Sequence, residues 1–139
     1  MDINVFIKDS EMPCLEKWQE ELDKLNEEIK LYDEFSVKED NGYIPCTIND
    51  KEAGFEFYYD VLEDTMFDPE DDPDLEKKLD GRDRCVGFSI PGENESIILG
   101  AYASAVLCKI TNGLYWVDPD FVEAPDPVEK IREQLESIL

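Results

Sequence analysis

Residues 93–111 read ENESIILGAYASAVLCKIT, and this stretch decides the fold because it is the most apolar helix candidate in the chain. Its apolar positions are Ile97, Ile98, Leu99, Ala101, Tyr102, Ala103, Ala105, Val106, Leu107 and Ile110. Glu93 and Glu95 complement the positive end of a helix, and Asn112-Gly113 supplies the left-handed residue that follows a helix C-terminus. Its small residues let a helix lie close to a sheet, whereas the stretch is too short to span a membrane. We therefore predict a central core helix.

Segments with strand character lie on both sides of this helix. They alternate in polarity or are apolar throughout, and several end at turn-forming residues such as Asn49-Asp50 and Pro91-Gly92. The predicted strands are residues 3–7, 29–35, 43–48, 54–59, 84–90 and 114–117. The short connections between the middle strands favour an antiparallel meander.

Two amphipathic helices complete the predicted fold. The first begins at Pro13, ends near residues 26–28 and places one apolar stripe inward: Leu15, Trp18, Leu22 and Leu25. The second begins at Asp126 with a capping box, and its apolar face is Val128, Ile131, Leu135 and Ile138. Residues 75–79 are expected to add one helical turn. We expect one α+β domain over residues 1–139, with a mostly antiparallel sheet of about five to six strands packed by the central helix and these two helices.

The chain is strongly acidic: 36 Asp and Glu stand against 13 Lys and Arg, which gives a formal net charge of -23. The run DVLEDTMFDPEDDPDLE, residues 60–76, has no basic residue. Such a run is either solvated or held for a positively charged partner. Phosphate backbones and anionic membranes repel a polyanion, which argues against both as ligands. A basic protein is the expected partner.

The sequence lacks the usual catalytic motifs. It has no histidine, which removes the commonest general base near neutral pH. An EF-hand loop starting at Asp68 would put Pro73 in place of the glycine and Leu79 in place of the bidentate glutamate, so only a weak divalent-ion site stays open. We expect no enzymatic activity and no cofactor.

The four cysteines, at residues 14, 46, 85 and 108, show no metal-binding spacing. Three of them lie inside apolar segments, as reduced cysteines of a protein core do. The N-terminal residues lack the basic region of a secretory signal. These features predict a cytoplasmic protein with free thiols.

Two acidic stretches with aromatic neighbours form the candidate contact surface, since an apolar anchor within a charged rim is typical of protein interfaces. The candidate partner-binding residues are Tyr59, Asp60, Glu63, Asp64, Phe67, Asp68, Glu70, Asp71, Asp72, Asp74, Trp116, Asp118 and Asp120. A plainer interpretation stays open, in which the acidic loop at about residues 60–80 is only a solvated surface.

Several short segments between residues 43 and 120 carry a resemblance. They are Gly54-Phe-Glu-Phe-Tyr-Tyr, the acidic run, Gly81-Arg82-Asp83 before Val86-Gly-Phe-Ser, a helix ending Lys109-Ile-Thr-Asn-Gly113, and a strand entering Val117-Asp118-Pro119. Their order resembles that of small bacterial immunity proteins of polymorphic toxin systems, in contact-dependent or type VI secretion. The resemblance implies a cytoplasmic inhibitor that covers the active site of a cognate toxin, with basic nuclease toxins as common partners of acidic members. It assigns no functional residues, and we interpret Arg82 and Asp83 first as a structural turn pair.

Two other functions stay open. An acidic adaptor or chaperone-like module would hold several basic clients with weak, salt-dependent affinity, without inhibiting them. A mimic of DNA would need carboxylates spaced like phosphates on a rigid surface, and Pro69 and Pro73 disfavour a helix that could carry them.

Overall fold

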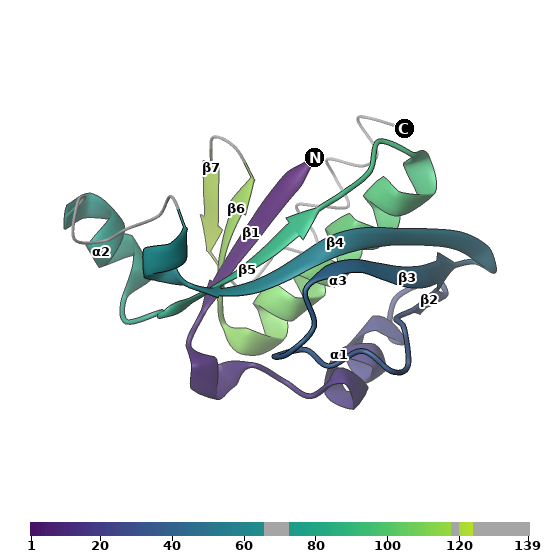
Figure 1. Ribbon diagram of the computed structural model, residues 1–139, viewed down its shortest axis with the longest axis horizontal. Helices are drawn as coiled ribbons and strands as arrows, with labels where there is room; N and C mark the ends of the chain where they lie inside the picture. Colours follow the sequence, from purple (N-terminus) through teal and green to yellow (C-terminus); the bar gives the residue numbers. More distant parts are fainter. Residues whose placement is uncertain (66–72, 118–119, 124–139) are drawn as a thin grey trace.

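The computed structural model describes residues 1–65, 73–117 and 120–123. It confirms the α+β class: seven strands form one antiparallel sheet in the order β2-β3-β4-β5-β1-β6-β7 (Figure 1). The strands are β1 (Asp2–Ile7), β2 (Ile29–Lys30), β3 (Gly42–Ile48), β4 (Lys51–Val61), β5 (Arg84–Ser89), β6 (Leu114–Val117) and β7 (Asp120–Glu123). The helices are α1 (Leu15–Leu22), α2 (Pro73–Leu79) and α3 (Asn94–Thr111), with short 3-10 turns η1 (Asp9–Glu11) and η2 (Leu62–Asp64).

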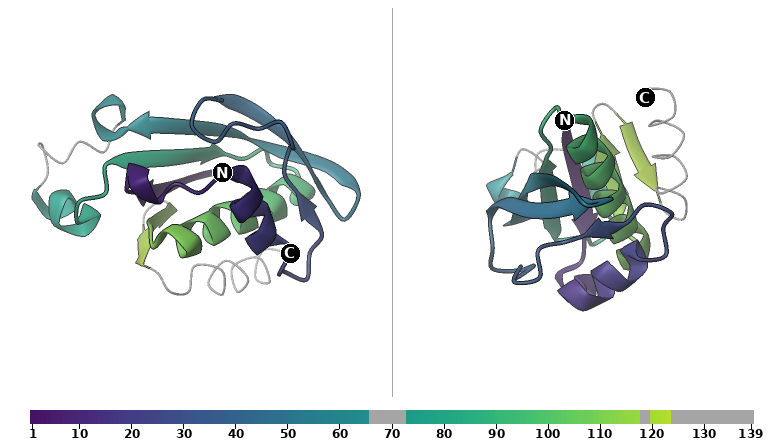
Figure 2. Two further views of the ribbon diagram at one scale, coloured as in Figure 1. Left: turned by 90° about the horizontal axis from the view of Figure 1, so that it is seen from below. Right: turned by 90° about the vertical axis from the view of Figure 1, so that its right-hand side faces the viewer.

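The central helix α3 lies where the sequence predicted it. It packs with α1 on one face of the sheet, and both helices lie below the sheet in the left panel of Figure 2. Gly100 explains why small residues are needed there, because a methyl carbon on it would lie 2.5 Å from Ile90 Cδ1. The helix ends at Asn112, whose φ of 51° is left-handed, and Gly113 N–H bonds back to the Cys108 carbonyl. Both predicted helix ends are confirmed.

The helix-covered face of the sheet contains the main core. Alternate residues of β1, β4 and β5 point into it, and the buried side chains include Ile3, Val5, Ile7, Phe55, Phe57, Val86 and Phe88. Trp18 on α1 fills the space between this layer and α3, and its indole N–H donates to the Ala103 carbonyl at 3.0 Å. The apolar stripe predicted for the first helix therefore faces the core, but the predicted end near residues 26–28 is wrong, because α1 ends at Leu22.

The β3–β4 hairpin also forms as predicted. Its two-residue turn is Asn49-Asp50, and both residues have positive φ, 50° and 65°, as the preferred turn of a tight hairpin requires. Asn49 also accepts a hydrogen bond from the Glu28 backbone N–H at 3.0 Å, which ties the turn to the start of β2.

The predicted strand at residues 29–35 is wrong in length, because β2 contains only Ile29 and Lys30. The chain turns immediately afterwards, with Phe35 N–H donating to the Tyr32 carbonyl, so that Phe35 reaches the core beside Phe57. The described sheet nevertheless has more strands than predicted, since β7 pairs with β6. The predicted helix that begins at Asp126 lies outside the described residues.

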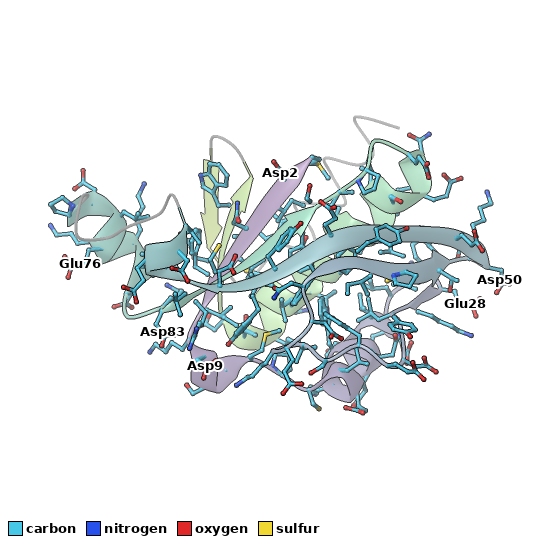
Figure 3. The ribbon with its side chains drawn as sticks, viewed as in Figure 1. Asp2, Asp9, Glu28, Asp50, Glu76 and Asp83 are labelled. Atoms are coloured by element: carbon cyan, nitrogen blue, oxygen red, sulfur yellow. The ribbon has the colours of Figure 1, made fainter. Side chains whose placement is uncertain are left out.

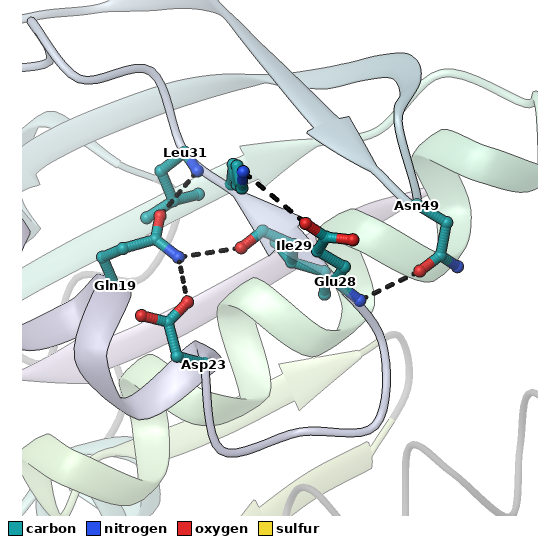
Figure 4. A network of polar contacts seen from close by, with 7 residues as sticks. Gln19, Asp23, Glu28, Ile29, Leu31 and Asn49 are labelled. Atoms are coloured by element: carbon teal, nitrogen blue, oxygen red, sulfur yellow. Dashed lines mark hydrogen bonds and ion pairs between the residues drawn. The ribbon is translucent and has the colours of Figure 1, made fainter.

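Gln19 of α1 closes the outer edge of β2 (Figure 4). Its side-chain N–H donates to the Ile29 carbonyl at 2.8 Å, and its side-chain oxygen accepts from Leu31 N–H at 2.8 Å. The same side-chain nitrogen donates a second hydrogen bond, to the Asp23 carboxylate at 2.9 Å. The amide thus makes the pair of hydrogen bonds that a neighbouring strand would otherwise make, which protects an edge that could pair with another chain.

Gln19→Glu is expected to lower the free energy of unfolding by about 1–3 kcal/mol, because a carboxylate cannot donate to the Ile29 carbonyl and would repel Asp23. Urea denaturation measures the change. Glu20→Gln, at the exposed neighbouring position, is the matched control and should have little effect. Equal stability of the Gln19 variant and the control would show that the edge needs no such cap.

Candidate protein-binding surface

The candidate surface is the sheet face opposite α3 and α1. β3, β4, β5 and β1 present alternate residues to it, and the register places Tyr43 opposite Glu56 and Tyr58 opposite Gly87. In Figure 1 the viewer looks onto this face, with α3 behind the strands. We call it the open face and define it by these residues: Asp2, Asn4, Tyr43, Pro45, Thr47, Glu52, Gly54, Glu56, Tyr58, Asp60, Gly87 and Ser89.

Among the residues that define the open face, every charged group is acidic, and Lys30 of β2, opposite Thr47, lies at the edge of the face with its ammonium 3.5 Å from Glu28. The carboxylates of the face are Asp2, Glu52, Glu56 and Asp60, and the set defined above includes no Lys or Arg. Asp60 is half-buried, and burial, followed by the nearby Asp64 charge, raises its carboxyl pKa. A cation brought to the centre of this face, along β4, would therefore meet a negative potential.

Two tyrosines are exposed on the same face. Tyr43 is 56% exposed and Tyr58 is 37% exposed, which makes them two of the most exposed large apolar side chains of the described residues. Each has a glycine neighbour: the Tyr43 ring end lies over Gly54, and Tyr58 lies beside Gly87. Exposed aromatic rings within an acidic surface have the composition of a protein-binding face.

The two glycines of this face should respond differently to substitution. A methyl carbon on Gly54 would lie 2.6 Å from both the Ile44 carbonyl oxygen and Tyr43 Oη, whereas on Gly87 its nearest neighbour is 3.6 Å away. Gly54→Ala should therefore cost about 1–3 kcal/mol of unfolding free energy. Gly87→Ala should be neutral or up to roughly 1 kcal/mol stabilising. Thermal unfolding of the pair measures this, and similar losses in both would contradict the described packing.

A second, smaller core closes one end of the open face. Phe6 of β1 and Cys85 of β5 pack there with leucines of η2 and α2, and Trp116 is half-buried against them. Trp116 thus contributes to structure as well as to the surface. Burial raises the pKa of the Cys85 thiol to about 12, and burial acts in the same way on Cys46 and Cys108. These three thiols are therefore poor nucleophiles.

The acidic run is not one loop where the structure describes it. Asp60 lies in β4, Glu63 and Asp64 are exposed on η2, and Asp74 is exposed in the first turn of α2. Asp60 belongs to the open face, and the other three residues follow it along the chain. The predicted contact residues Phe67, Asp68, Glu70, Asp71, Asp72 and Asp118 lie outside the described residues, and Asp120 is placed only as the first residue of β7.

Tyr59 points to the opposite side from Tyr58. Its hydroxyl donates to the Asp9 carboxylate, and its ring packs against the main core and lies 5.6 Å from the Arg84 guanidinium carbon. That hydrogen bond lowers the Asp9 pKa, and Lys38 and Arg84 act in the same direction from 3.4 and 3.7 Å. Tyr59 is therefore used in the fold, and of these two neighbours it is Tyr58 that is exposed on the open face, as Tyr43 is.

The polar group around Asp9 ties η1 to the sheet. The Asp9 backbone N–H donates to the Asp83 carboxylate at 2.8 Å, and Figure 3 labels both residues beside one another. Arg82 bonds the Leu79 and Asn112 carbonyls, at the ends of α2 and α3. Arg82 and Asp83 thus hold the chain turn before β5, in agreement with their interpretation as a structural pair.

Sequence reasoning missed Tyr43, Glu52 and Glu56 as contact candidates. The signal was present as period-2 alternation along residues 52–60, where Glu52, Gly54, Glu56, Tyr58 and Asp60 share one face of a strand. The density of acidic residues along positions 60–76 indicated the acidic run instead.

Comparisons with protein-family models, with curated proteins and with solved structures gave no match. Over residues 1–65, 73–117 and 120–123, no helix has the length and apolar character needed to cross a bilayer. The same part of the chain brings together no group of three or more acidic or cysteine side chains able to hold a metal ion.

Proposed function

We propose that this chain is an inhibitor of the immunity-protein kind, which binds a basic, nuclease-type bacterial toxin and neutralises it by covering its active site. The observation that carries the proposal is the open face, where two exposed tyrosines and four carboxylates lie on strands β1, β3 and β4, and these strands and β5 present no Lys or Arg to that face. A nuclease presents Lys and Arg to phosphate, and a negatively charged protein surface can occupy the same groups.

The charge of the chain supports the same class of partner. At a net charge of -23, long-range attraction accelerates association with a cationic protein, and exposed aromatic groups add contact that persists when salt screens the charges. A tight inhibitor needs both components, whereas charge alone gives weak binding that salt removes.

Affinity capture followed by a toxicity assay tests this function. The tagged chain is incubated with a lysate of its native cells at low and then high salt, and each retained protein is expressed in a bacterium with and without the chain. We expect one basic protein that survives high salt, arrests growth when alone and is harmless with the chain. Retention of many basic proteins that salt removes together would instead identify an acidic adaptor, and a single partner without toxicity would reject the inhibitor.

A further inference from the structure

We propose that the open face recognises arginine side chains of its protein partner, with the rings of Tyr43 and Tyr58 as stacking platforms and Glu56 as the carboxylate between them. This inference rests on the proposed function, which supplies the identity of the partner as a basic protein. It adds the chemistry by which the open face would hold that protein.

The Tyr43 ring lies low on the sheet. A methyl carbon placed on Gly54 would lie 2.7 Å from Tyr43 Cζ and 2.6 Å from Tyr43 Oη. The hydroxyl end of the ring therefore occupies the space in which a side chain at position 54 would begin. Because Gly54 has no side chain, the ring can lie over the backbone with one surface toward β4. More than half of the residue remains exposed, at 56%, which leaves ring surface available to a partner.

Carboxylates and rings alternate along β4. Glu52, Glu56 and Asp60 are four residues apart, or about 13 Å in a strand, and Tyr43 lies over Gly54 between the first two. Tyr58 lies between the last two, and its Cβ and Cδ2 are 3.7 and 3.9 Å from the methyl position of Gly87. Glu56 is directly opposite Tyr43 and two residues before Tyr58, so either ring has this carboxylate as a neighbour. The Glu56 carboxylate also contributes to a raised pKa of Tyr58, after the effect of burial.

This pattern fits arginine better than other occupants. A guanidinium stacks its plane on an aromatic ring and can pair with a carboxylate through its edge at the same time, whereas an ammonium is a hydrated point charge. A second copy of this chain would bring a second set of carboxylates against the first, and a nucleic acid would bring phosphates. Charge complementarity therefore selects a basic protein segment that carries arginine.

The test uses the full chain and a capped five-residue peptide that carries two arginines, followed by NMR. The same peptide with lysine, or with uncharged citrulline, replaces it in parallel titrations. We expect the arginine peptide to shift amide signals of residues 43–47, 52–60 and 85–89, the lysine peptide to bind several-fold more weakly, and the citrulline peptide not to bind. Equal binding of arginine and lysine, binding of citrulline, or shifts confined to other regions would overturn the proposal.

Tyrosine variants provide the second arm. Tyr43→Leu and Tyr58→Leu should each weaken the arginine peptide about 3-fold, and Tyr43→Phe should retain binding because it retains the ring. Tyr32→Leu is the matched control, since Tyr32 is 38% exposed and bonded to Glu34 but lies outside the open face. An equal effect of Tyr32→Leu would contradict the assignment. These titrations need no toxin, so they test the arginine platform separately from the proposed function. Peptide binding together with a failed rescue assay would reject the proposed function alone. Rescue without peptide binding would reject the arginine platform alone.

Discussion

The triple variant Glu52→Lys, Glu56→Lys, Asp60→Lys is expected to weaken binding of the captured basic partner about 100-fold or more, because three attractive contacts become repulsive. The three residues share the open face along β4, so the substitution reverses its potential without entering the main core. Association should slow, and its dependence on salt should flatten, because fewer favourable charges remain to be screened. Calorimetric titration and surface-based kinetics at two salt concentrations measure both effects.

A control variant with the same change in net charge distinguishes binding through the open face from a general effect of the charge of the chain. Glu16 and Glu20 are exposed on α1, which lies on the other side of the sheet, and the exposed Asp33 lines the same shallow pocket as both of them. Changing these three to lysine should slow association only slightly and leave the dissociation rate unchanged. If both triple variants lose the same affinity, attraction is diffuse and the open face is not the interface.

The largest expected loss of stability follows from Trp18→Ala, at about 3–5 kcal/mol of unfolding free energy. Trp18 is fully buried and is the largest side chain of the core, with ring centroids of Phe35, Phe57 and Phe88 at 6.1–6.2 Å. Its removal leaves a cavity between α1, α3 and the sheet and deletes the hydrogen bond to the Ala103 carbonyl.

Urea denaturation of Trp18→Ala measures this loss, with Trp18→Phe as the comparison. The phenylalanine variant keeps most of the ring contact and should lose less than the alanine variant. A change below about 1 kcal/mol for Trp18→Ala would mean that α1 is not packed between α3 and the sheet as described.

Local features of the fold were predictable because neighbouring residues determine them. The apolar stretch and its left-handed Asn112 defined α3, and Asn49-Asp50 defined the β3–β4 turn. The strand order was not predictable in this way. β1 pairs with β5 and β6, and these pairings depend on contacts between residues 77 or more positions apart, such as Ile3 with Phe88 and Val117.

The contact surface was only partly predictable, for a related reason. Acids that are adjacent in sequence alternate between the two faces of a strand, so the density of charge along a chain does not locate a charged face. Tyr59 illustrates this alternation. It follows Tyr58 in the sequence but points to the opposite face, where its hydroxyl bonds to Asp9, fifty residues away. Glu52, Glu56 and Asp60 are separated in sequence but share one face through period-2 spacing.

Carboxylate footprinting of the complex tests most directly whether the open face binds the partner. The chain is treated with a carbodiimide and an amine label, free and bound to the basic partner recovered by affinity capture, and labelling at each acid is quantified by mass spectrometry. We predict a several-fold decrease at Glu52, Glu56 and Asp60, with no change at Glu16, Glu20 and Asp33. Protection confined to Glu63, Asp64 and Asp74, or to the acids near α1, would contradict binding through the open face.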